Sequence, residues 1–386
     1  MSIFILFTTI FTSIIIRIII VSHSLDVADI KLLYAMGEAV LQGLNPYLAL
    51  SYNIYPPIAL YMEAASIQLS QTLNVPFHII TRIWPNLADL LIALVLYKFL
   101  LNLKVKPLTA SLWSAFFILN PLSIIISASH GQIDSIPSLL VLLAIYMLSL
   151  KTNKLSYNLA ALCLGIAIAI KPNPVILLPF FLFFKPTSIK EKINFLLFCT
   201  APTILTLLPF IRADLTQVLG KILSYSGVYD FSYAALLRGV WYEQNANIWL
   251  PLTQELLNAS KLTFIIASLI LFILYTKHTN LTKICLAIYL LFLGFYFGIS
   301  AQYLVWILPL AIIDRSKMVF FYSFSVIIAL LGFYLFFGPD ILLGNFKQLE
   351  AFQSEFMLLY FTGNLLLWTT VLIWFAKYLG YIRCEC

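Results

Sequence analysis

Charged side chains are scarce in this chain. Asp, Glu, Lys and Arg make up 10% of its 386 residues, whereas hydrophobic side chains make up 62%. A soluble globular domain carries about 25% charged residues, so an ordinary soluble protein is excluded and most of the chain must lie in lipid. The sequence also lacks the alternating segments of roughly ten residues that build a membrane barrel. Helices are therefore the predicted spanning structure.

Residues that form disulfide frameworks and metal sites are also few. Three of the five cysteines, Cys163, Cys199 and Cys285, lie in apolar runs, where a thiol behaves as a small hydrophobic group. The four histidines are scattered, so their spacing indicates no metal site. Neither Gly-x-x-x-x-Gly-Lys-Ser/Thr nor Gly-x-Gly-x-x-Gly occurs, which leaves a nucleotide-dependent reaction without local support. The residues indicate no certain cofactor, and a divalent metal stays open.

Apolar runs recur from one end of the chain to the other. A helix that crosses a bilayer about 30 Å thick needs about 20 residues. We predict an all-α, polytopic membrane bundle with about twelve or thirteen transmembrane helices, and the first of them is a retained anchor because it lacks a small-residue cleavage site. The predicted spans are 2–21, 55–74, 83–103, 108–127, 134–150, 155–170, 173–185, 192–211, 260–276, 281–297, 300–314, 318–337 and 357–377.

These spans are expected to form a single multi-pass membrane domain over residues 1–386. Within it, 1–211 would be a catalytic helical module, 212–258 an extracytoplasmic loop and 259–386 a set of C-terminal helices. Basic residues such as Lys104 and Lys106 lie in the short connections, which is the positive-inside pattern of cytoplasmic loops. The net charge of +7 therefore reflects membrane orientation, with membrane lipid as a partner and no nucleic acid.

The side of the membrane occupied by the first long loop, 22–54, is ambiguous. With the N-terminus inside, this loop lies outside, but counting back from Lys104 and Lys106 as inside places it inside. The conflict disappears if Lys104 and Lys106 do not mark the inside, or if one of three predicted spans is re-entrant: 55–74, 83–103 or 108–127. We predict that four loops share one extracytoplasmic face: 22–54, 128–133, 171–173 and 212–258.

The loop 22–54 has the pattern of an ordered segment. Apolar residues from Ile30 to Leu41 recur at helical spacing, which predicts a short amphipathic helix on the membrane surface. Gly43 follows as a typical C-terminal stop. Turns are expected at Asn45-Pro46 and Pro56-Pro57. The loop is thus predicted to carry interfacial helices rather than free chain.

Two carboxylates stand just outside the first span, and either could act as a general base. Asp29 immediately precedes the predicted interfacial helix, where it could instead serve as the N-cap. Asp26 lies three residues earlier and could instead be a solvated loop carboxylate. We predict Asp29 and Asp26 as the catalytic candidates.

Polar residues at membrane depth are costly and are candidates for function. The predicted substrate-binding residues are Tyr34, Tyr47, His130, Gln132, Asp134, Lys171, Arg238 and Gln302. Asp134 could instead cap a helix, and Lys171 could reach the interface rather than bind a phosphate. Arg238 could belong to an interfacial belt rather than clamp a phosphate, and the group around Gln302 could be an aromatic anchor. Glu63 and Asp89 are predicted to make interhelical hydrogen bonds.

Taken in order along the chain, these positions resemble the C-type (GT-C) glycosyltransferases that use polyprenyl-phosphate sugars. The likeness is greatest to the mannosyltransferase-like branch. Each motif is weak alone, and together they touch about three quarters of the chain. The matching residues are Asp29, Tyr34, Gly43-x-Asn45-Pro46-Tyr47, Tyr55-Pro56-Pro57, Asn120-Pro121, Gly131-Gln132-x-Asp134, Lys171-Pro172-x-Pro174 and Gln302-Tyr303-x-x-Trp306-x-x-Pro309.

The resemblance implies an essential carboxylate in the first extracytoplasmic loop, at the position of Asp29. It implies an inverting transferase that moves a hexose, mannose in particular, from a lipid-phosphate sugar donor to a lipid-linked, glycan or protein acceptor. The expected location is the plasma membrane, or the endoplasmic reticulum membrane in a eukaryote. The alternatives are a transporter or flippase of a lipid-linked saccharide, which predicts internal pseudo-symmetry, and a non-catalytic subunit of an assembly complex.

Overall fold

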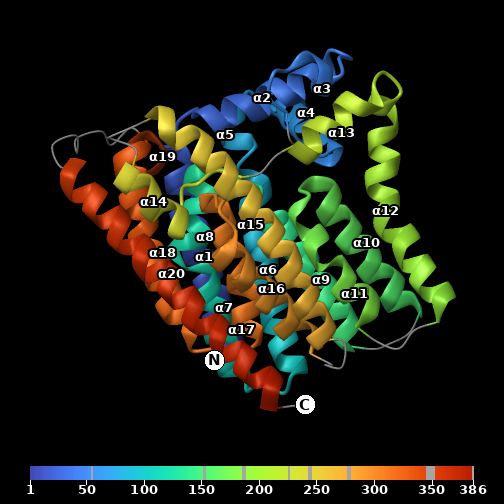
Figure 1. Cartoon of the computed structure of the whole chain (residues 1–386), viewed down its shortest axis with the longest axis vertical. Coiled ribbons are helices and arrows are strands. Elements are labelled where there is room, and N and C mark those ends of the chain that lie inside the picture. The colour runs from blue at the N-terminus through green and yellow to red at the C-terminus, as the bar shows by residue number, and fades with distance from the viewer. Residues whose placement is uncertain are drawn as a thin grey trace. The chain divides into compact units, whose positions relative to one another are not determined.

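The computed structural model in Figure 1 is built from helices. It describes residues 1–53, 55–150, 154–184, 188–224, 227–241, 246–275, 280–344 and 353–384. Within these ranges every regular element is a helix and none is a strand. The prediction of an all-α polytopic membrane protein is therefore confirmed.

The chain divides into two compact units. Unit 1 comprises Met1–Leu119, Ser127–Leu178 and Lys185–Tyr225, and unit 2 comprises Asn120–Ile126, Pro179–Phe184 and Ser226–Cys386. All of the first long loop, together with His130 and Lys171, belongs to unit 1. Unit 1 therefore contains most of the residues that the sequence singles out for function.

Unit 1 is built from long apolar helices and from shorter helices in their connections. They are α1 (Ser2–Ser22), α2 (Ala28–Leu41), α3 (Pro46–Ala49), α4 (Pro57–Leu73), α5 (Phe77–Ile80), α6 (Ile83–Asn102), α7 (Pro107–Ile118), α9 (Ser135–Leu150), α10 (Lys154–Ile170), the 3-10 helix η2 (Asn173–Leu177), α12 (Ile189–Ile211) and α13 (Leu215–Ser224). The π-helix η1 (Ile125–His130) enters unit 1 at its second half.

Unit 2 holds the remaining helices. They are α8 (Pro121–Ile124), α11 (Leu178–Phe183), α14 (Tyr233–Trp241), α15 (Ala246–Tyr275), α16 (Leu281–Phe295), the 3-10 helix η3 (Ala301–Trp306), α17 (Ile307–Ile313), α18 (Met318–Phe337), α19 (Pro339–Leu343) and α20 (Gln353–Cys384). Helices α18 and α20 pack closely, because Gly332 and Gly363 lie directly against the backbone of the opposite helix.

Each predicted span falls on a helix, but many of these helices are short. In the described part of the chain, six helices are long and apolar enough to cross a membrane, or seven if one bent pair forms a single span. The other predicted spans fall on helices of 17 residues or fewer. The number of crossings therefore stays a prediction.

The bent pair bears on the topology ambiguity. Pro107–Ile118 and Pro121–His130 meet at 43°, where Asn120 caps the second helix through its side chain and Pro121 occupies the first helical position. This pair covers the predicted span 108–127, one of the three segments that could be re-entrant. A pair that is re-entrant here would leave the residues before and after it on the same membrane face.

Most of the predicted loop 212–258 is helical where the structure describes it. It contains α13, α14 and the start of α15. The side chain of Val218 on α13 is fully buried, and Lys221 donates a hydrogen bond to the carbonyl of Leu50. This segment folds as helices because its apolar residues recur at helical spacing. The many polar residues between them made that spacing hard to recognise in the sequence.

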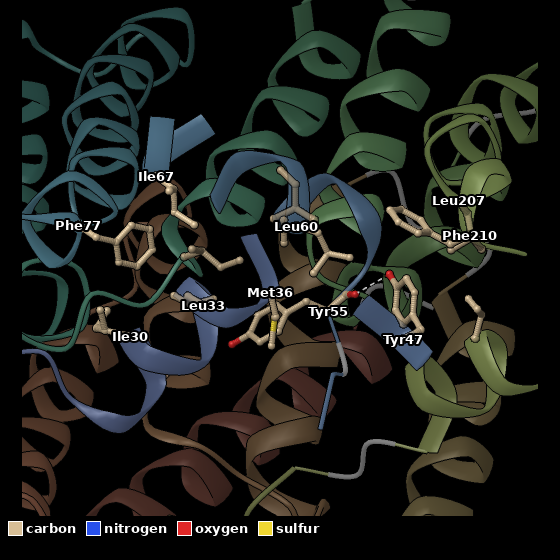
Figure 2. Close-up of a cluster of buried hydrophobic side chains, with 14 residues drawn as sticks. Ile30, Leu33, Met36, Tyr47, Tyr55, Leu60, Ile67, Phe77, Leu207 and Phe210 are labelled. Carbon is tan, nitrogen blue, oxygen red and sulfur yellow. Dashed lines mark hydrogen bonds between the residues drawn. The ribbon is translucent and has the colours of Figure 1, made fainter. Parts of the chain in front are cut away.

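Helix α2 lies over a hydrophobic cluster that holds it against α4 (Figure 2). Ile30, Leu33 and Met36 form the buried face of α2. Gly37 allows the close approach, since a Cβ there would lie 2.7 Å from the backbone carbonyl carbon of Glu63. The predicted interfacial helix is thus confirmed as a helix, and its position is fixed by packing in unit 1.

Candidate functional site

Asp29 lies in the first turn of α2, and it does not cap that helix. The N-cap is Val27, with extended backbone and no side-chain cap. The capping alternative for Asp29 was therefore wrong by two positions. A carboxylate in the first turn is still favoured by the helix dipole, and its oxygen atoms remain available to other partners.

The segment that faces Asp29 is an interrupted helix. The π-helix η1 ends at His130, and π-helical turns are rare and often occur at functional sites. Gly131 follows with φ of +81°, a conformation that glycine adopts without strain. This turn connects η1 to α9 and places His130 and Gln132 against the same carboxylate oxygen.

The Asp29 carboxylate bonds to both of these side chains. His130 Nε2 lies 2.9 Å from Asp29 Oδ2, and Gln132 Nε2 donates to the same oxygen at 2.6 Å. An ionised carboxylate only accepts, so His130 Nε2 carries the shared proton. Its approach to Gln132 Nε2 at 3.2 Å is then a contact between two donors.

Exposure differs sharply across this cluster. The Asp29 side chain is 49% exposed, whereas that of His130 is 7% exposed. Gln132 is also buried. The carboxylate is therefore open to an incoming molecule on one side and held by buried donors on the other.

The surroundings of Asp29 favour its ionised form. Burial by itself would raise the pKa of the carboxyl group, but the hydrogen bond and charge of His130, the charge of Lys171 and the hydrogen bond from Gln132 outweigh it. The pKa of Asp29 consequently lies below the ordinary aspartate value. At neutral pH the group is a carboxylate that can accept a proton.

Asp134 and Lys171 form a buried ion pair beside this cluster. Lys171 Nζ donates to Asp134 Oδ2 at 2.6 Å, and the two side chains are 6% and 0% exposed. Lys171 also lies 5.7 Å from the centre of the Tyr55 ring. The ammonium is held inside unit 1 by Asp134, so it does not extend towards an interface as the alternative for Lys171 required.

These contacts test the predicted grouping of loops. Asp29, His130 and Lys171 come from three of the loops expected to share a face, and they lie close together in unit 1. Asp134, the first residue of the predicted span 134–150, pairs there with Lys171. Lys221 joins the start of the fourth loop to Leu50. These segments therefore lie together in unit 1, and their place on one extracytoplasmic face stays a prediction.

Asp26 and Tyr34 lie in a different place from Asp29. They line a pocket of about 260 Å³ with Lys31, Phe77 and His78. The rings of Tyr34 and Phe77 meet edge to face, with their centroids 5.2 Å apart. Along α2, Lys31 and Tyr34 point away from the face that carries Asp29. The two candidate acids are thus separated, and Asp29 is the one that the buried donors contact.

Tyr47 does not join this cluster, although it belongs to unit 1. Tyr47 is fully buried, and its hydroxyl donates to the carbonyl of Tyr55 at 2.8 Å (Figure 2). It is therefore a core residue with no surface for a substrate. Gln302 is half-buried on η3 of unit 2. The side chain of Arg238, on α14, lies outside the described residues.

The aromatic residues that follow Gln302 are buried in unit 2. The rings of Tyr303 and Trp306 pack at a tilt with centroids 4.5 Å apart, and the two residues are 2% and 5% exposed. An exposed interfacial anchor would require open rings, so that alternative is not met. Their burial makes them part of the core of unit 2.

Two buried arginines were missed by the sequence predictions. Arg17, inside the apolar helix α1, pairs with Asp89 of α6 at 2.8 Å. Arg82, at the start of α6, is fully buried and bonds to three backbone carbonyls. Arg17 could have been found from the sequence, because an ionisable residue inside a predicted span is by default a candidate for function. The interhelical bonds predicted for Asp89 and Glu63 are confirmed, since Glu63 accepts from Thr81 at 2.7 Å.

No cluster suited to a metal ion is evident in the described ranges. Groups of three or more His, Cys, Asp or Glu side chains with that geometry do not occur there. Among the cysteines predicted as core groups, Cys199 and Cys285 are buried and Cys163 is half-buried. Their surroundings agree with a packing role.

We expect replacement of His130 to move the pH dependence that Asp29 controls. A lowered pKa keeps the carboxylate ionised until the pH falls through that value. In His130→Ala the hydrogen bond and charge that lower the pKa are lost while burial remains, so the pKa of Asp29 rises and the acid limb of activity moves to higher pH. Measuring kcat/KM against pH tests this. His23→Ala, at the end of α1, is the control, and an acid limb that stays in place in His130→Ala contradicts the assignment.

Comparison with known proteins gives a partial match. No family model matches the chain. Over an alignment of 153 residues it is 28% identical to GPI mannosyltransferase 1 of Candida albicans, covering 38% of this chain and 35% of that protein. The aligned segment therefore spans about a third of the relative's length. The chain is mannosyltransferase-like over this segment, in agreement with a multi-pass membrane glycosyltransferase.

Proposed function

We propose that this protein is an inverting glycosyltransferase that moves mannose from a polyprenyl-phosphate donor to a hydroxyl group of a lipid-linked or glycan acceptor. One observation carries the proposal. The Asp29 carboxylate is half-exposed, ionised and held from behind by His130 and Gln132. A fixed carboxylate with one open side is what a general base requires.

The partial match to a mannosyltransferase supports the choice of sugar. The polytopic fold supports a donor that resides in the membrane. A lipid-phosphate donor also needs no nucleotide, and the sequence offers no nucleotide-binding motif. The extracytoplasmic face is proposed because a donor of this kind can act where nucleotide sugars are absent.

The reaction follows from these parts. The acceptor oxygen attacks C1 of the sugar from the face opposite the phosphate, and the bond between C1 and the phosphate oxygen breaks. The polyprenyl phosphate leaves with the bonding electron pair, and the acceptor proton passes to Asp29. Inverting glycosidases use a carboxylate base in the same way, with water as the acceptor.

The lowered pKa of Asp29 suits a late proton transfer. A base of low pKa is weak towards a neutral alcohol. The acceptor hydroxyl becomes strongly acidic only as its oxygen bonds to the oxocarbenium-like carbon, and at that stage a weak base is sufficient. Asp29 therefore acts after bond formation has begun, while His130 and Gln132 keep it oriented.

Gln132 offers a further contact for substrate. Its Oε1 atom is buried and has no hydrogen-bond partner in the described structure. An unsatisfied buried acceptor costs about 1–3 kcal/mol. A substrate hydroxyl would complete this oxygen only after the side chains that cover it have moved. Gln132 would then bond to Asp29 through its amide nitrogen and to the sugar through its oxygen.

The position of Lys171 does not suit a phosphate clamp, which needs an accessible ammonium group. Its ammonium already pairs with Asp134 and is 6% exposed, so contact with a phosphate would require that pair to open. In the described structure its charge acts on Asp29. Lys171 is therefore proposed as an electrostatic partner of the base, and the phosphate-binding role of Arg238 stays a prediction from the sequence.

A reconstituted transfer assay tests the proposal. The purified protein is placed in liposomes with a total lipid extract as acceptor, and radiolabelled polyprenyl-phosphate-mannose is compared with the glucose and arabinose donors and with GDP-mannose. We expect label to enter a new product from polyprenyl-phosphate-mannose and not from GDP-mannose. Movement of the donor between leaflets without product would favour a flippase, and transfer from GDP-mannose would contradict the donor class.

A further inference from the structure

Arg82 connects the two segments that bring the candidate base and its partners together. It stands at the junction between α5 and α6 and is fully buried. A buried guanidinium must have its donors satisfied, because an unpaired charge in an apolar interior is strongly unfavourable. The hydrogen-bond acceptors of Arg82 therefore indicate its role.

The acceptors of Arg82 are backbone carbonyls from three segments. Nε and Nη2 both donate to the carbonyl of Ser129, at 3.3 and 3.0 Å. Nη2 also donates to Leu25 at 3.2 Å, and Nη1 donates to His78 at 2.6 Å. The planar guanidinium reaches these carbonyls at once, which a lysine ammonium on a single flexible stem does not do.

Two of these carbonyls lie next to the reactive cluster. Ser129 directly precedes His130, and Leu25 lies in the connection between α1 and α2, shortly before Asp29. One side chain thus bonds to both chain segments whose tips meet at the contact of 2.9 Å between Asp29 and His130. Besides Arg82, the two segments are joined by the bonds of Asp29 to His130 and Gln132 and by apolar packing of Ile30 and Ile133, and Arg82 adds bonds to the backbone of both.

The space around Gly131 is a second, independent observation that places Arg82 against the turn. A Cβ at this position would lie 2.9 Å from Cγ and 3.1 Å from Nε of Arg82. The turn that presents His130 and Gln132 therefore rests directly on the arginine side chain. Any side chain at position 131 would push the turn and the guanidinium apart.

We propose that Arg82 is a positioning residue that holds the Asp29 segment in register with His130 and Gln132. The hydrogen bonds of Arg82 go to backbone carbonyls and not to the Asp29 carboxylate. It acts by fixing the backbone on both sides of the carboxylate, so it sets the orientation of the base. The kinetic consequence rests on the proposed function, while the structural consequence does not.

Hydrogen exchange measured by mass spectrometry tests the structural consequence. In Arg82→Lys we expect peptides covering residues 24–35 and 127–133 to exchange together about tenfold faster or more, the effect of losing charged hydrogen bonds to the backbone. Arg17→Lys is the matched control, because Arg17 is a buried guanidinium of the same unit that pairs with Asp89 instead. Unchanged exchange in Arg82→Lys, or a change in only one segment, overturns the proposal.

Transfer kinetics test the functional consequence. Misplacing a catalytic group by about 1 Å can cost about 100-fold in rate, so kcat per folded molecule should fall by that order in Arg82→Lys and in Gly131→Ala, with KM little changed. The acid limb of the pH profile should also move to higher pH, because Asp29 loses its alignment with His130. Arg17→Lys should keep the wild-type profile. A loss of folded protein with normal kcat and pH profile in the remainder would assign Arg82 a purely structural role and contradict the proposal.

If the wild-type protein transfers no sugar from any donor, the proposed function fails and the exchange measurement still decides the role of Arg82. If sugar is transferred and exchange is unchanged in Arg82→Lys, the proposed function stands and the positioning role is rejected. Gly131→Ala leaves the guanidinium charge intact and disturbs its fit against the turn. It also strains the backbone at φ of +81° and presses on Ile30, so its effect is interpreted only together with that of Arg82→Lys.

Discussion

Replacing Asp29 by asparagine should lower kcat about 1,000-fold, within the range of general acid–base catalysis, while leaving the protein folded and inserted. Asparagine keeps the shape of the side chain and can still accept from Gln132, so α2 should stay packed on its hydrophobic cluster. It cannot take up the acceptor proton. Initial rates in liposomes, normalised to folded protein by size-exclusion chromatography, give the measurement.

Asp26→Asn provides the matched control for this variant. Asp26 belongs to the same connection but lines a pocket with Tyr34 and His78 rather than contacting His130. We expect its kcat to stay within about tenfold of wild type, since no step of acid–base catalysis is assigned to it. Full activity of Asp29→Asn with loss in Asp26→Asn would move the base to Asp26, and full activity in both would contradict a carboxylate mechanism.

Breaking the buried ion pair between Arg17 and Asp89 should cause the largest loss of stability. The two side chains are 4% and 0% exposed, and their charged atoms are 2.8 Å apart. Removing one partner of a buried pair leaves an uncompensated charge and costs about 3–5 kcal/mol. Arg17→Met and Asp89→Leu should each lower the free energy of unfolding by this amount, as measured by denaturation in detergent.

The double variant distinguishes a true pair from two separate contributions. Arg17→Met combined with Asp89→Leu removes both charges, so much of the loss should be recovered, as a double-mutant cycle detects. Lys98→Met, on the exposed side of α6, should change stability by no more than about 0.5 kcal/mol. Strictly additive losses in the double variant would show that the pair contributes no coupling energy.

The helices could be predicted from the sequence because their signals are local. Apolar runs, the stop at Gly43 and the break at Lys171-Pro172 depend on residues close together in the chain, and helices occur where these signals place them. The number of spans stays a prediction. In the described structure six helices are long and apolar enough to cross a membrane, or seven with the bent pair, and the other predicted spans fall on shorter apolar helices.

The chemistry of individual residues depended on tertiary packing. Asp29 looked like a helix cap, and the start of α2 at Ala28 removed that role. Tyr47 looked like a binding residue, and the core between α3 and α4 buried it. In both cases the local sequence allowed two roles, and contacts with distant segments selected one.

The sequence by itself determined that this is a helical membrane protein with a few polar side chains gathered at the ends of its helices. The physical reason is that transfer of apolar side chains out of water and the hydrogen bonding of the backbone in lipid are set by composition and local order. Only the tertiary structure decided which carboxylate meets His130 and Gln132, and that Arg82 joins their segments. Those partners lie about a hundred positions apart in sequence, so their meeting depends on how the helices pack.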